Sequence, residues 1–433
     1  MQVRRLSDGT AVWLDPMRDV KSLALGIYVA AGSADEAPGE RGATHFLEHL
    51  LFRRTRRRSG AAIARITDRL GGDCDAYTTK ECVAFHARVP AARAAEAVDL
   101  LLDLTAAPAF TAADVEVERG VILEEIAEAH DVPDDLLHDT LVRALWPAHD
   151  LGAPIFGTKE SVSALARVRL AARFKAIFRP ERTLVVAAGA LDADRLERIL
   201  ERGRARRPAP APADVRPPGS APRTVRCSVA LPRADLGQAH LVVGSAAPLR
   251  WADPRVPAAW IAAEVLGGGV SSRLWRDVRE RRGLAYHVGA HVSLHRDAGL
   301  ALITAATHPK NLARLVRTTG RVLGRLLRDG VTRAELSRAK NQFAAEAALA
   351  QESTASRREA AARAWLSRGR PYPTEEYLAD VERVTADGVA AAARLLWAGS
   401  RRVGLGVAGP IPEAKARDVA RALADDFERE IAA

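Results

Sequence analysis

Short apolar runs typical of strands recur along the chain, and stretches with helical periodicity separate them. In the first half, runs rich in Val, Ala and Leu predict strands at Thr10–Leu14, Ser22–Ala31, Cys74–Thr79, Cys82–Val89 and Thr183–Ala188. Apolar residues spaced three and four apart predict helices at Gly42–Phe52, Ala61–Leu70, Ala91–Leu104 and Asp192–Glu201. A largely helical stretch over Ala112–Arg173 is interrupted at Pro133, Pro147 and Pro154.

The second half repeats this order of elements. Its predicted strands are Val225–Leu231, His240–Ser245, Ala285–Leu294, Leu300–Ala306 and Val403–Val407. Its predicted helices are Val256–Leu266, Arg273–Arg281 and Glu413–Ile431, with further long helices between the last two strands. An order of elements that is used twice predicts two α+β domains of similar topology.

A segment rich in Pro, Ala and Arg lies between the two halves. Residues Gly203–Arg223 lack a periodic apolar pattern, which is typical of an extended linker. We therefore predict an N-terminal domain over residues 1–203, a linker over 204–222 and a C-terminal domain over 223–433. With 433 residues the chain is long enough for two domains of about 150 residues or more, each with its own core.

Composition and charge exclude several classes of protein. The 64 Lys and Arg exceed the 54 Asp and Glu by 10, but 48% hydrophobic and 27% charged residues are the proportions of a folded globular protein. The arginines are spread over predicted helix faces and only 5% of residues are aromatic, so we expect no nucleic-acid binding. Three cysteines without C-x-x-C spacing favour neither a disulfide framework nor a thiolate zinc site.

The amino terminus and the apolar runs bear on localisation. Met1–Pro16 contains arginines and acidic residues but no apolar core, so it does not have the pattern of a secretory signal. The longest apolar runs, such as Leu23–Ala31, are far shorter than the roughly 18 residues of a membrane span. We therefore expect a cytoplasmic protein that does not enter a membrane.

The candidate chemistry lies in the segment His45-Phe-Leu-Glu48-His49 on a predicted helix. Positions i and i+4 share one helix face, so both imidazoles can reach a single metal ion. Glu48 places a carboxylate beside a metal-bound water, where a general base is needed. This order, H-x-x-E-H, is the inverse of the commoner zinc-protease motif.

A second predicted helix offers the remaining ligand. A catalytic zinc ion needs a third protein ligand from another element and keeps its fourth position open. The segment Glu116–Ile126 contains carboxylates at Glu118, Glu124 and Glu125 that can supply it.

With these motifs the sequence resembles the pitrilysin-type inverzincins, the zinc peptidase family of insulin-degrading enzyme and mitochondrial processing peptidase. The resemblance rests on GATHFLEHLLF and ERGVILEEI, and on GGDCDAYTTKE, FRPERTLVVAAG and LGGGVSSRLWRDVRERRGLAYHV. It covers nearly the whole chain and is greatest to the bacterial half-size members. It implies an α+β fold of two homologous α/β-sandwich domains in tandem, each an antiparallel-rich sheet covered by helices, which form half of a clam-shell dimer.

The resemblance also implies the roles of residues in the first half. His45, His49 and Glu125 would bind one zinc ion per chain, and Glu48 would be the general base. Glu118 would support the ligands from the same helix face as Glu125, seven residues further on.

Glu124 is the competing choice for the third ligand. The spacing to Glu118 favours Glu125 instead.

Substrate contacts are implied for two further segments. Asp75, Ala76 and Tyr77 lie on the predicted edge strand, along which an extended substrate would pair. Asp75 stands where the family usually has Asn. An amide, which donates and accepts hydrogen bonds, is thus replaced by a carboxylate, which only accepts them. In the second half, Arg279 and Tyr286 match the Arg and Tyr that are implied to stabilise the tetrahedral oxyanion.

These assignments predict a zinc-dependent endopeptidase that hydrolyses peptides or unfolded polypeptides. Because the ligands lie in one half and the Arg–Tyr pair in the other, the resemblance implies a homodimer with composite sites; a heterodimer with a homologous subunit is the alternative. Two other functions stay open, a non-catalytic structural or assembly subunit and a dedicated protease for leader-peptide maturation.

Overall fold

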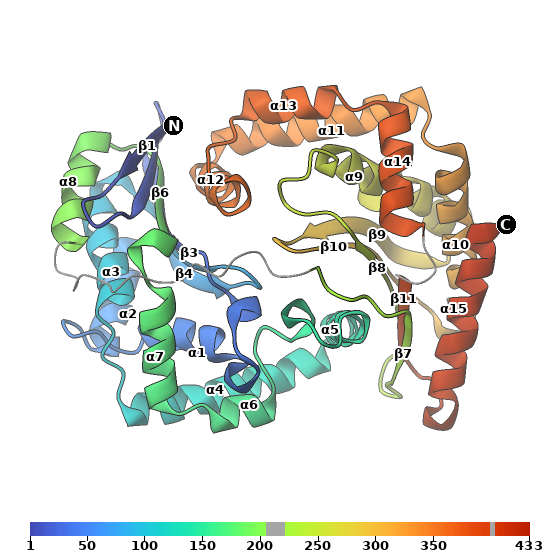
Figure 1. Ribbon diagram of the computed structural model, residues 1–433, viewed down its shortest axis with the longest axis horizontal. Coiled ribbons are helices and arrows are strands. Elements are labelled where there is room, and N and C mark those ends of the chain that lie inside the picture. Colours follow the sequence, from blue (N-terminus) through green and yellow to red (C-terminus); the bar gives the residue numbers. More distant parts are fainter. Residues whose placement is uncertain (205–220, 399–402) are drawn as a thin grey trace. The chain divides into compact units, whose positions relative to one another are not determined.

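Each half of the chain contributes one mixed β-sheet (Figure 1), and the five strands of the second sheet repeat the order of five of the six strands of the first. The computed structural model describes residues 1–204, 221–398 and 403–433. Most of the predicted linker over 204–222 therefore lies outside the described residues. The two sheets and their covering helices confirm the predicted α+β class and the repeated plan.

The first sheet has the order β1-β2-β6-β3-β5-β4. Its strands are β1 (Gln2–Arg5), β2 (Ala11–Pro16), β3 (Ser22–Val29), β4 (Asp73–Thr78), β5 (Val83–Pro90) and β6 (Thr183–Gly189). β2 and β6 are parallel and all other neighbours are antiparallel. β4 lies at the edge, with Asp75 opposite His86 of β5. β1 was not predicted, because its sequence QVRR has no apolar run and three of its four residues are exposed.

The second sheet has the order β7-β11-β8-β10-β9. Its strands are β7 (Cys227–Pro232), β8 (Ala239–Ala247), β9 (Ala285–Leu294), β10 (Gly299–Thr307) and β11 (Val403–Gly409). β7 and β11 are parallel and the other neighbours are antiparallel, as in the run β2-β6-β3-β5-β4. β9 thus has the edge position that β4 has in the first sheet.

Helices cover both faces of the first sheet (Figure 1). α1, α3 and α8 pack on one face, with α2, α4 and α7 beside them, and α12 packs on the other. The bounds are α1 (Ala43–Leu51), α2 (Gly60–Leu70), α3 (Ala94–Ala106), α4 (Ala112–Asp131), α6 (Lys159–Ala164), α7 (Arg167–Ile177), α8 (Ala193–Arg204) and α12 (Thr354–Arg368).

The second sheet is covered in the same way, by α5 on one face and by α9, α10, α14 and α15 around the main core on the other. The bounds are α5 (Pro133–Leu145), α9 (Val256–Ala263), α10 (Leu312–Asp329), α11 (Arg333–Glu352), α13 (Thr374–Glu382), α14 (Ala386–Trp397) and α15 (Ala416–Ala432). The predicted helices at Val256–Leu266 and Arg273–Arg281 contain wider π-helical turns at η6 (Glu264–Gly268) and η7 (Trp275–Glu280). Short 3-10 turns occur at η1 (Ser33–Asp35), η2 (Pro38–Glu40), η3 (Ala91–Arg93), η4 (Asp150–Gly152), η5 (Pro180–Arg182), η8 (Pro309–Asn311) and η10 (Glu413–Lys415).

Each of the two compact units includes one segment from the other half of the chain, so the units do not follow the predicted bounds of 1–203 and 223–433 throughout. Glu128–Gly152, with α5, belongs to the second unit, and Ala348–Tyr372, with α12, belongs to the first. Periodicity shows that a helix has an apolar face, but it does not show which sheet covers that face. A division at the linker therefore places both segments in the other unit.

Glycines in the second sheet explain why α5 packs there. Leu137, Leu141 and Leu145 recur every four residues and are fully buried. A Cβ on Gly404 would lie 3.0 Å from Leu141 Cδ1, and one on Gly406 would lie 3.0 Å from Leu137 Cδ1. The absence of side chains on β11 thus leaves the space that the leucines fill.

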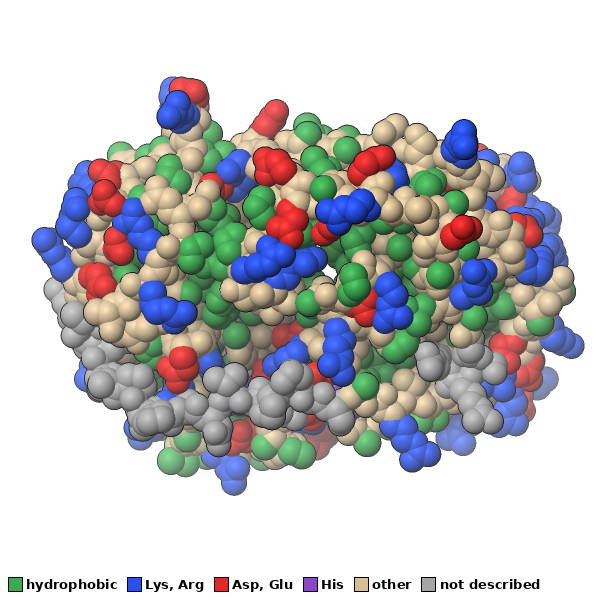
Figure 2. Space-filling model, turned by 45° about the horizontal axis from the view of Figure 1, so that its top comes forward, with side chains coloured by type: hydrophobic (Ala, Val, Ile, Leu, Met, Phe, Trp, Pro, Cys, Tyr) green, Lys and Arg blue, Asp and Glu red, His purple; other side chains and the backbone are tan. Residues whose placement is uncertain are grey.

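The helices and the charged surface side chains bear on membrane and nucleic-acid binding. No helix among the described residues is long and apolar enough to cross a bilayer. On the face shown in Figure 2, Lys and Arg side chains are interspersed with Asp and Glu side chains.

Candidate metal centre

Helix α1 carries both histidines, and a residue outside the helix caps its start. Gly42 precedes the helix with a φ of 87°, and a Cβ there would lie 2.4 Å from the Phe156 carbonyl oxygen, so glycine is required. Glu36 accepts hydrogen bonds from the backbone N–H of Gly42 at 2.8 Å and of Thr44 at 2.6 Å. Its carboxylate also complements the positive end of the helix dipole.

Arg173 of α7 fastens the same end of α1 to the loop before it. Its buried guanidinium donates to the carbonyl oxygens of Asp35 at 2.8 Å and Gly32 at 3.1 Å, and to Thr44 Oγ1 at 3.0 Å. Sequence analysis missed Glu36 and Arg173. The available signal was that Gly42 has no side chain to cap the helix, which calls for a cap from elsewhere.

The three predicted ligands converge at one point in the first unit. The ligand atoms of His45, His49 and Glu125 all lie within 4.8 Å of one another. Glu125 Oε2 is 3.7 Å from His45 Nε2 and 3.4 Å from His49 Nε2. Donor atoms that share a tetrahedral zinc ion at about 2.1 Å are separated by about 3.4 Å. Glu124, the competing ligand, is exposed and is not part of the cluster.

The chemistry of these donors fits zinc. Two imidazoles and one carboxylate form a ligand set that catalytic zinc sites use. Glu125 Oε2 is buried and has no hydrogen-bond partner among the described residues. An orphaned carboxylate oxygen is costly, and a cation between Glu125 and the two histidines would satisfy it.

The two histidines differ in their protonation without a metal ion. Burial lowers the pKa of His45 to about 4, which keeps its imidazole neutral. Burial also disfavours the charged form of His49, but the nearby carboxylates of Glu118 and Glu125 outweigh it and raise its pKa to about 9. Glu118 Oε2 lies 3.2 Å from His49 Nδ1, so it contacts the ring nitrogen that faces away from Glu125. Glu118 is therefore placed to orient the His49 ring.

Glu48 lies beside the cluster and is oriented by the edge strand. Thr78 Oγ1 donates a hydrogen bond of 2.5 Å to Glu48 Oε2. Burial raises the pKa of the Glu48 carboxyl, and the bond from Thr78 partly opposes this rise. Sequence analysis did not single out Thr78, because its contact with Glu48 depends on how α1 packs against β4.

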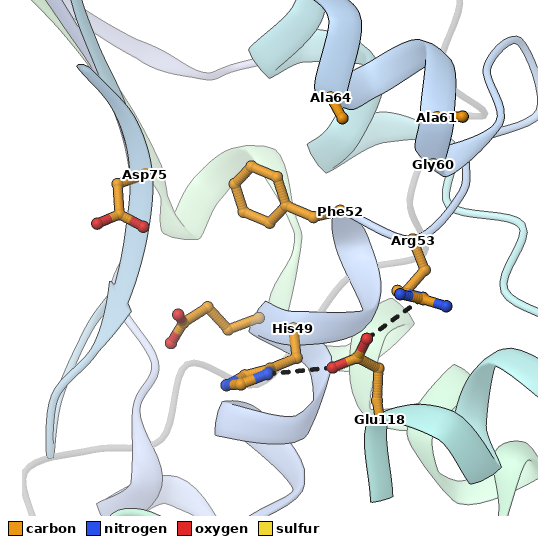
Figure 3. A pocket seen from close by; sticks show the side chains of 9 residues that line it. His49, Phe52, Arg53, Gly60, Ala61, Ala64, Asp75 and Glu118 are labelled. Atoms are coloured by element: carbon orange, nitrogen blue, oxygen red, sulfur yellow. Dashed lines mark hydrogen bonds and ion pairs between the residues drawn. The ribbon is translucent and has the colours of Figure 1, made fainter. Parts of the chain in front are cut away.

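A cavity of about 570 Å³ opens next to Glu48 and His49 (Figure 3). It lies between the end of α1, the start of α2, β4 and α4. Small side chains on α2 give it room, and the Phe52 ring and the Arg53 guanidinium line it from the end of α1. The lining residues are Glu48, His49, Phe52, Arg53, Gly60, Ala61, Ala64, Asp75 and Glu118.

The predicted substrate-contacting residues occupy the edge strand β4. Ala76 packs into the core on the side of α1, and Tyr77 packs on the side of α12. Tyr77 Oη donates to Glu359 Oε1 at 2.8 Å. Asp75 is exposed and accepts from the backbone N–H of Ala76 at 2.8 Å.

The predicted Arg–Tyr pair lies within the second unit. The Arg279 guanidinium is 4.0 Å from the ring centroid of Trp275 and 4.5 Å from that of Tyr286. Tyr286 is 79% exposed, so its phenol faces solvent. The structure therefore brings Arg279 and Tyr286 together.

Comparison with known proteins gives the same picture. Residues 16–159 match the family described as Insulinase (Peptidase family M16), and residues 165–343 match the Peptidase M16 inactive domain. A protein of Mycobacterium tuberculosis named an uncharacterized zinc protease is 39% identical over 94% of this chain and 92% of its own length. A Bacillus subtilis protein, also named an uncharacterized zinc protease, is 32% identical over 90% of this chain and 94% of its own.

Solved structures show the same fold. A protease from Helicobacter pylori superposes with a TM-score of 0.88 at 17% identity, covering 94% of this chain and 99% of that one. An M16 inactive domain from Pseudomonas fluorescens gives 0.85 at 21% identity, covering 95% and 98%. The fold and the cluster thus define a tandem α+β protein with a two-histidine, one-glutamate centre. The chain belongs to peptidase family M16, the insulinase family, which confirms the resemblance seen in its motifs.

Proposed function

We propose that the protein is a zinc-dependent endopeptidase acting on peptides or unfolded polypeptides. The observation that carries this proposal is the convergence of His45, His49 and Glu125, in which one buried oxygen of Glu125 faces both imidazoles. Zinc, when bound there, would polarise a water molecule and the scissile carbonyl.

Glu48 would carry the proton through the reaction. It takes a proton from the attacking water and delivers it to the leaving amine. Its buried position raises its pKa, which brings a carboxylate closer to the neutral range in which a base must also act as an acid. Thr78 keeps the carboxylate in one orientation through both steps.

The substrate would bind as an extended strand along the open edge of β4. An edge strand presents unpaired backbone groups, and a peptide that pairs with it gains affinity without a sequence requirement. Side chains next to the scissile bond would enter the cavity beside Glu48 and His49.

Arg279 and Tyr286 would stabilise the tetrahedral oxyanion. Their adjacent cationic and phenolic groups, with Tyr286 exposed, suit that role. We propose that they come from the facing chain of a homodimer, with a heterodimer of homologous subunits as the alternative.

The test is cleavage of a quenched peptide library by the wild type and by Glu48→Gln, with bound zinc measured on the same samples. We expect zinc in both proteins and cleavage only by the wild type. Zinc without cleavage in the wild type would favour a dedicated leader-peptide protease or a missing partner. No zinc in either protein would overturn the proposal in favour of a structural or assembly subunit.

A further inference from the structure

We propose that Arg53 is a positioning residue for the metal centre, which acts by holding the Glu118 carboxylate in the orientation that supports His49. The inference rests on the proposed function in one respect, that the cluster binds a divalent metal ion. Arg53 itself contacts none of the three ligands.

The Glu118 carboxylate divides its two oxygens between two partners (Figure 3). Oε2 lies 3.2 Å from His49 Nδ1, and Oε1 lies 3.2 Å from Arg53 Nε. The two contacts together fix the plane of the carboxylate, since a carboxylate held at one oxygen alone can still turn about its last bond. Arg53 therefore determines how well Glu118 can orient the imidazole.

Burial makes this dependence strong. The Glu118 side chain is only 8% exposed, and its carboxylate pairs with His49 and Arg53. Without Arg53, Oε1 would lose its charged partner, and the carboxylate would be free to turn toward the adjoining cavity. Groups that hold a ligating histidine from behind typically change metal affinity by about 10- to 100-fold.

Arg53 lies at the surface, where we expect a substitution to leave the fold intact. It follows the last turn of α1 and its side chain is 41% exposed. Its function can therefore be tested by substitution in a folded protein.

Arg54 provides a matched control in the same segment. Its side chain is 45% exposed, and its Nε lies 3.4 Å from Asp114 Oδ2 on α4, the helix that also carries Glu118. Asp114 is otherwise bonded to Thr111 and does not contact the ligands. Arg53 and Arg54 thus make similar ion pairs with carboxylates of α4, but only the carboxylate paired with Arg53 also contacts His49.

The experiment measures zinc affinity of the full chain by competition with a chromophoric chelator. We expect Arg53→Ala to weaken affinity about tenfold, Arg53→Lys to recover most of the loss, and Arg54→Ala to leave affinity unchanged. The melting temperature of each metal-free variant is recorded to show that the fold is intact.

A double substitution separates positioning from a general charge effect. In a Glu118→Gln background, Arg53→Ala should cause no further loss, because the group through which it acts has been altered. The visible spectrum of the cobalt-loaded protein should change with Arg53→Ala and not with Arg54→Ala.

The outcomes distinguish this inference from the proposed function. Unchanged affinity in Arg53→Ala, an equal loss in Arg54→Ala, or a full additional loss in the Glu118→Gln background would each overturn the positioning role while leaving a zinc site in place. Failure of the wild type to bind zinc would instead overturn both.

Discussion

The two ligating histidines of α1 have different protonation states before a metal ion binds. At pH 7 without metal, His45 is neutral because its pKa is about 4, whereas His49 is protonated because its pKa is about 9. Only His49 must therefore lose a proton to become a ligand. Burial lowers the pKa of His45, whereas the carboxylates around His49 raise the pKa of that residue.

Zinc binding should accordingly release about one proton at pH 7. The apparent affinity should rise about tenfold per pH unit between 7 and 9 and level off above 9, where His49 is already neutral. Calorimetry in two buffers of different ionisation enthalpy gives the number of protons. An affinity independent of pH over this range would contradict the assignment.

The orientation of Glu48 can be tested at Thr78. Thr78→Val keeps the shape of the side chain but removes the hydrogen bond, so we expect kcat to fall about tenfold, the value of one bond to a charged group. Because that bond lowers the pKa of Glu48, its loss should move the acid limb of the pH–rate profile to higher pH.

Thr79→Val is the matched control for this substitution. The Thr79 hydroxyl bonds to the backbone of Cys82 and not to Glu48. Equal effects of the two substitutions on rate and pH profile would show that the Thr78 contact has no special role.

The stability of a helix terminus depends on the side chains that cap it, and the cap of α11 can be tested separately from the metal centre. At the start of α11, Thr332 and Glu335 cap each other. The Glu335 N–H donates to Thr332 Oγ1 at 3.2 Å, and the Thr332 N–H donates to Glu335 Oε2 at 2.9 Å. Arg273 adds two bonds of 2.8 Å to the same carboxylate. Burial opposes ionisation of Glu335, but the bonds from Arg273 and Thr332 outweigh it and lower its pKa to about 2.

Glu335→Gln should therefore lower the free energy of unfolding by about 2 kcal/mol near pH 7. A depressed pKa in the folded state stabilises above the ordinary Glu value and loses this effect as the pH falls toward 2. Urea unfolding at pH 7 and pH 3 should show the difference between variant and wild type shrinking. Glu382→Gln, at an exposed carboxylate, is the control and should change little at either pH.

Elements were predictable where the apolar pattern decides their type. The edge strand β9 was predicted to the residue, and the interior strands of both sheets within about two residues, because their apolar runs are long and bounded by turn residues. The same pattern placed His45 and His49 on one helix face. The contacts of Glu36, Thr78 and Arg53 were not predictable, because each joins segments whose packing is decided by the whole unit.

The proposed site, which combines residues of two chains, predicts how the chains of a dimer depend on each other. If each site combines the zinc ligands of one chain with Arg279 and Tyr286 of its partner, two inactive variants should restore activity when their dimers exchange subunits. Mixing Glu48→Gln with Arg279→Ala should give about a quarter of wild-type activity, since half of the dimers then contain one intact site of two.

Mixing Glu48→Gln with His45→Ala is the control for this experiment. Both lesions affect the same part of the site, so no combination of the two chains rebuilds it. Absence of recovery with Arg279→Ala as well would show that each chain supplies a complete site.

The central claim is that His45, His49 and Glu125 hold the metal ion, and the adjacent glutamates of α4 allow a direct test. Zinc per chain should be measured by elemental analysis in the wild type, Glu125→Gln and Glu124→Gln. We predict one zinc per chain in the wild type and in Glu124→Gln, and severe loss in Glu125→Gln, because only Glu125 faces both imidazoles. Zinc retained in Glu125→Gln, or lost in Glu124→Gln, would contradict the account.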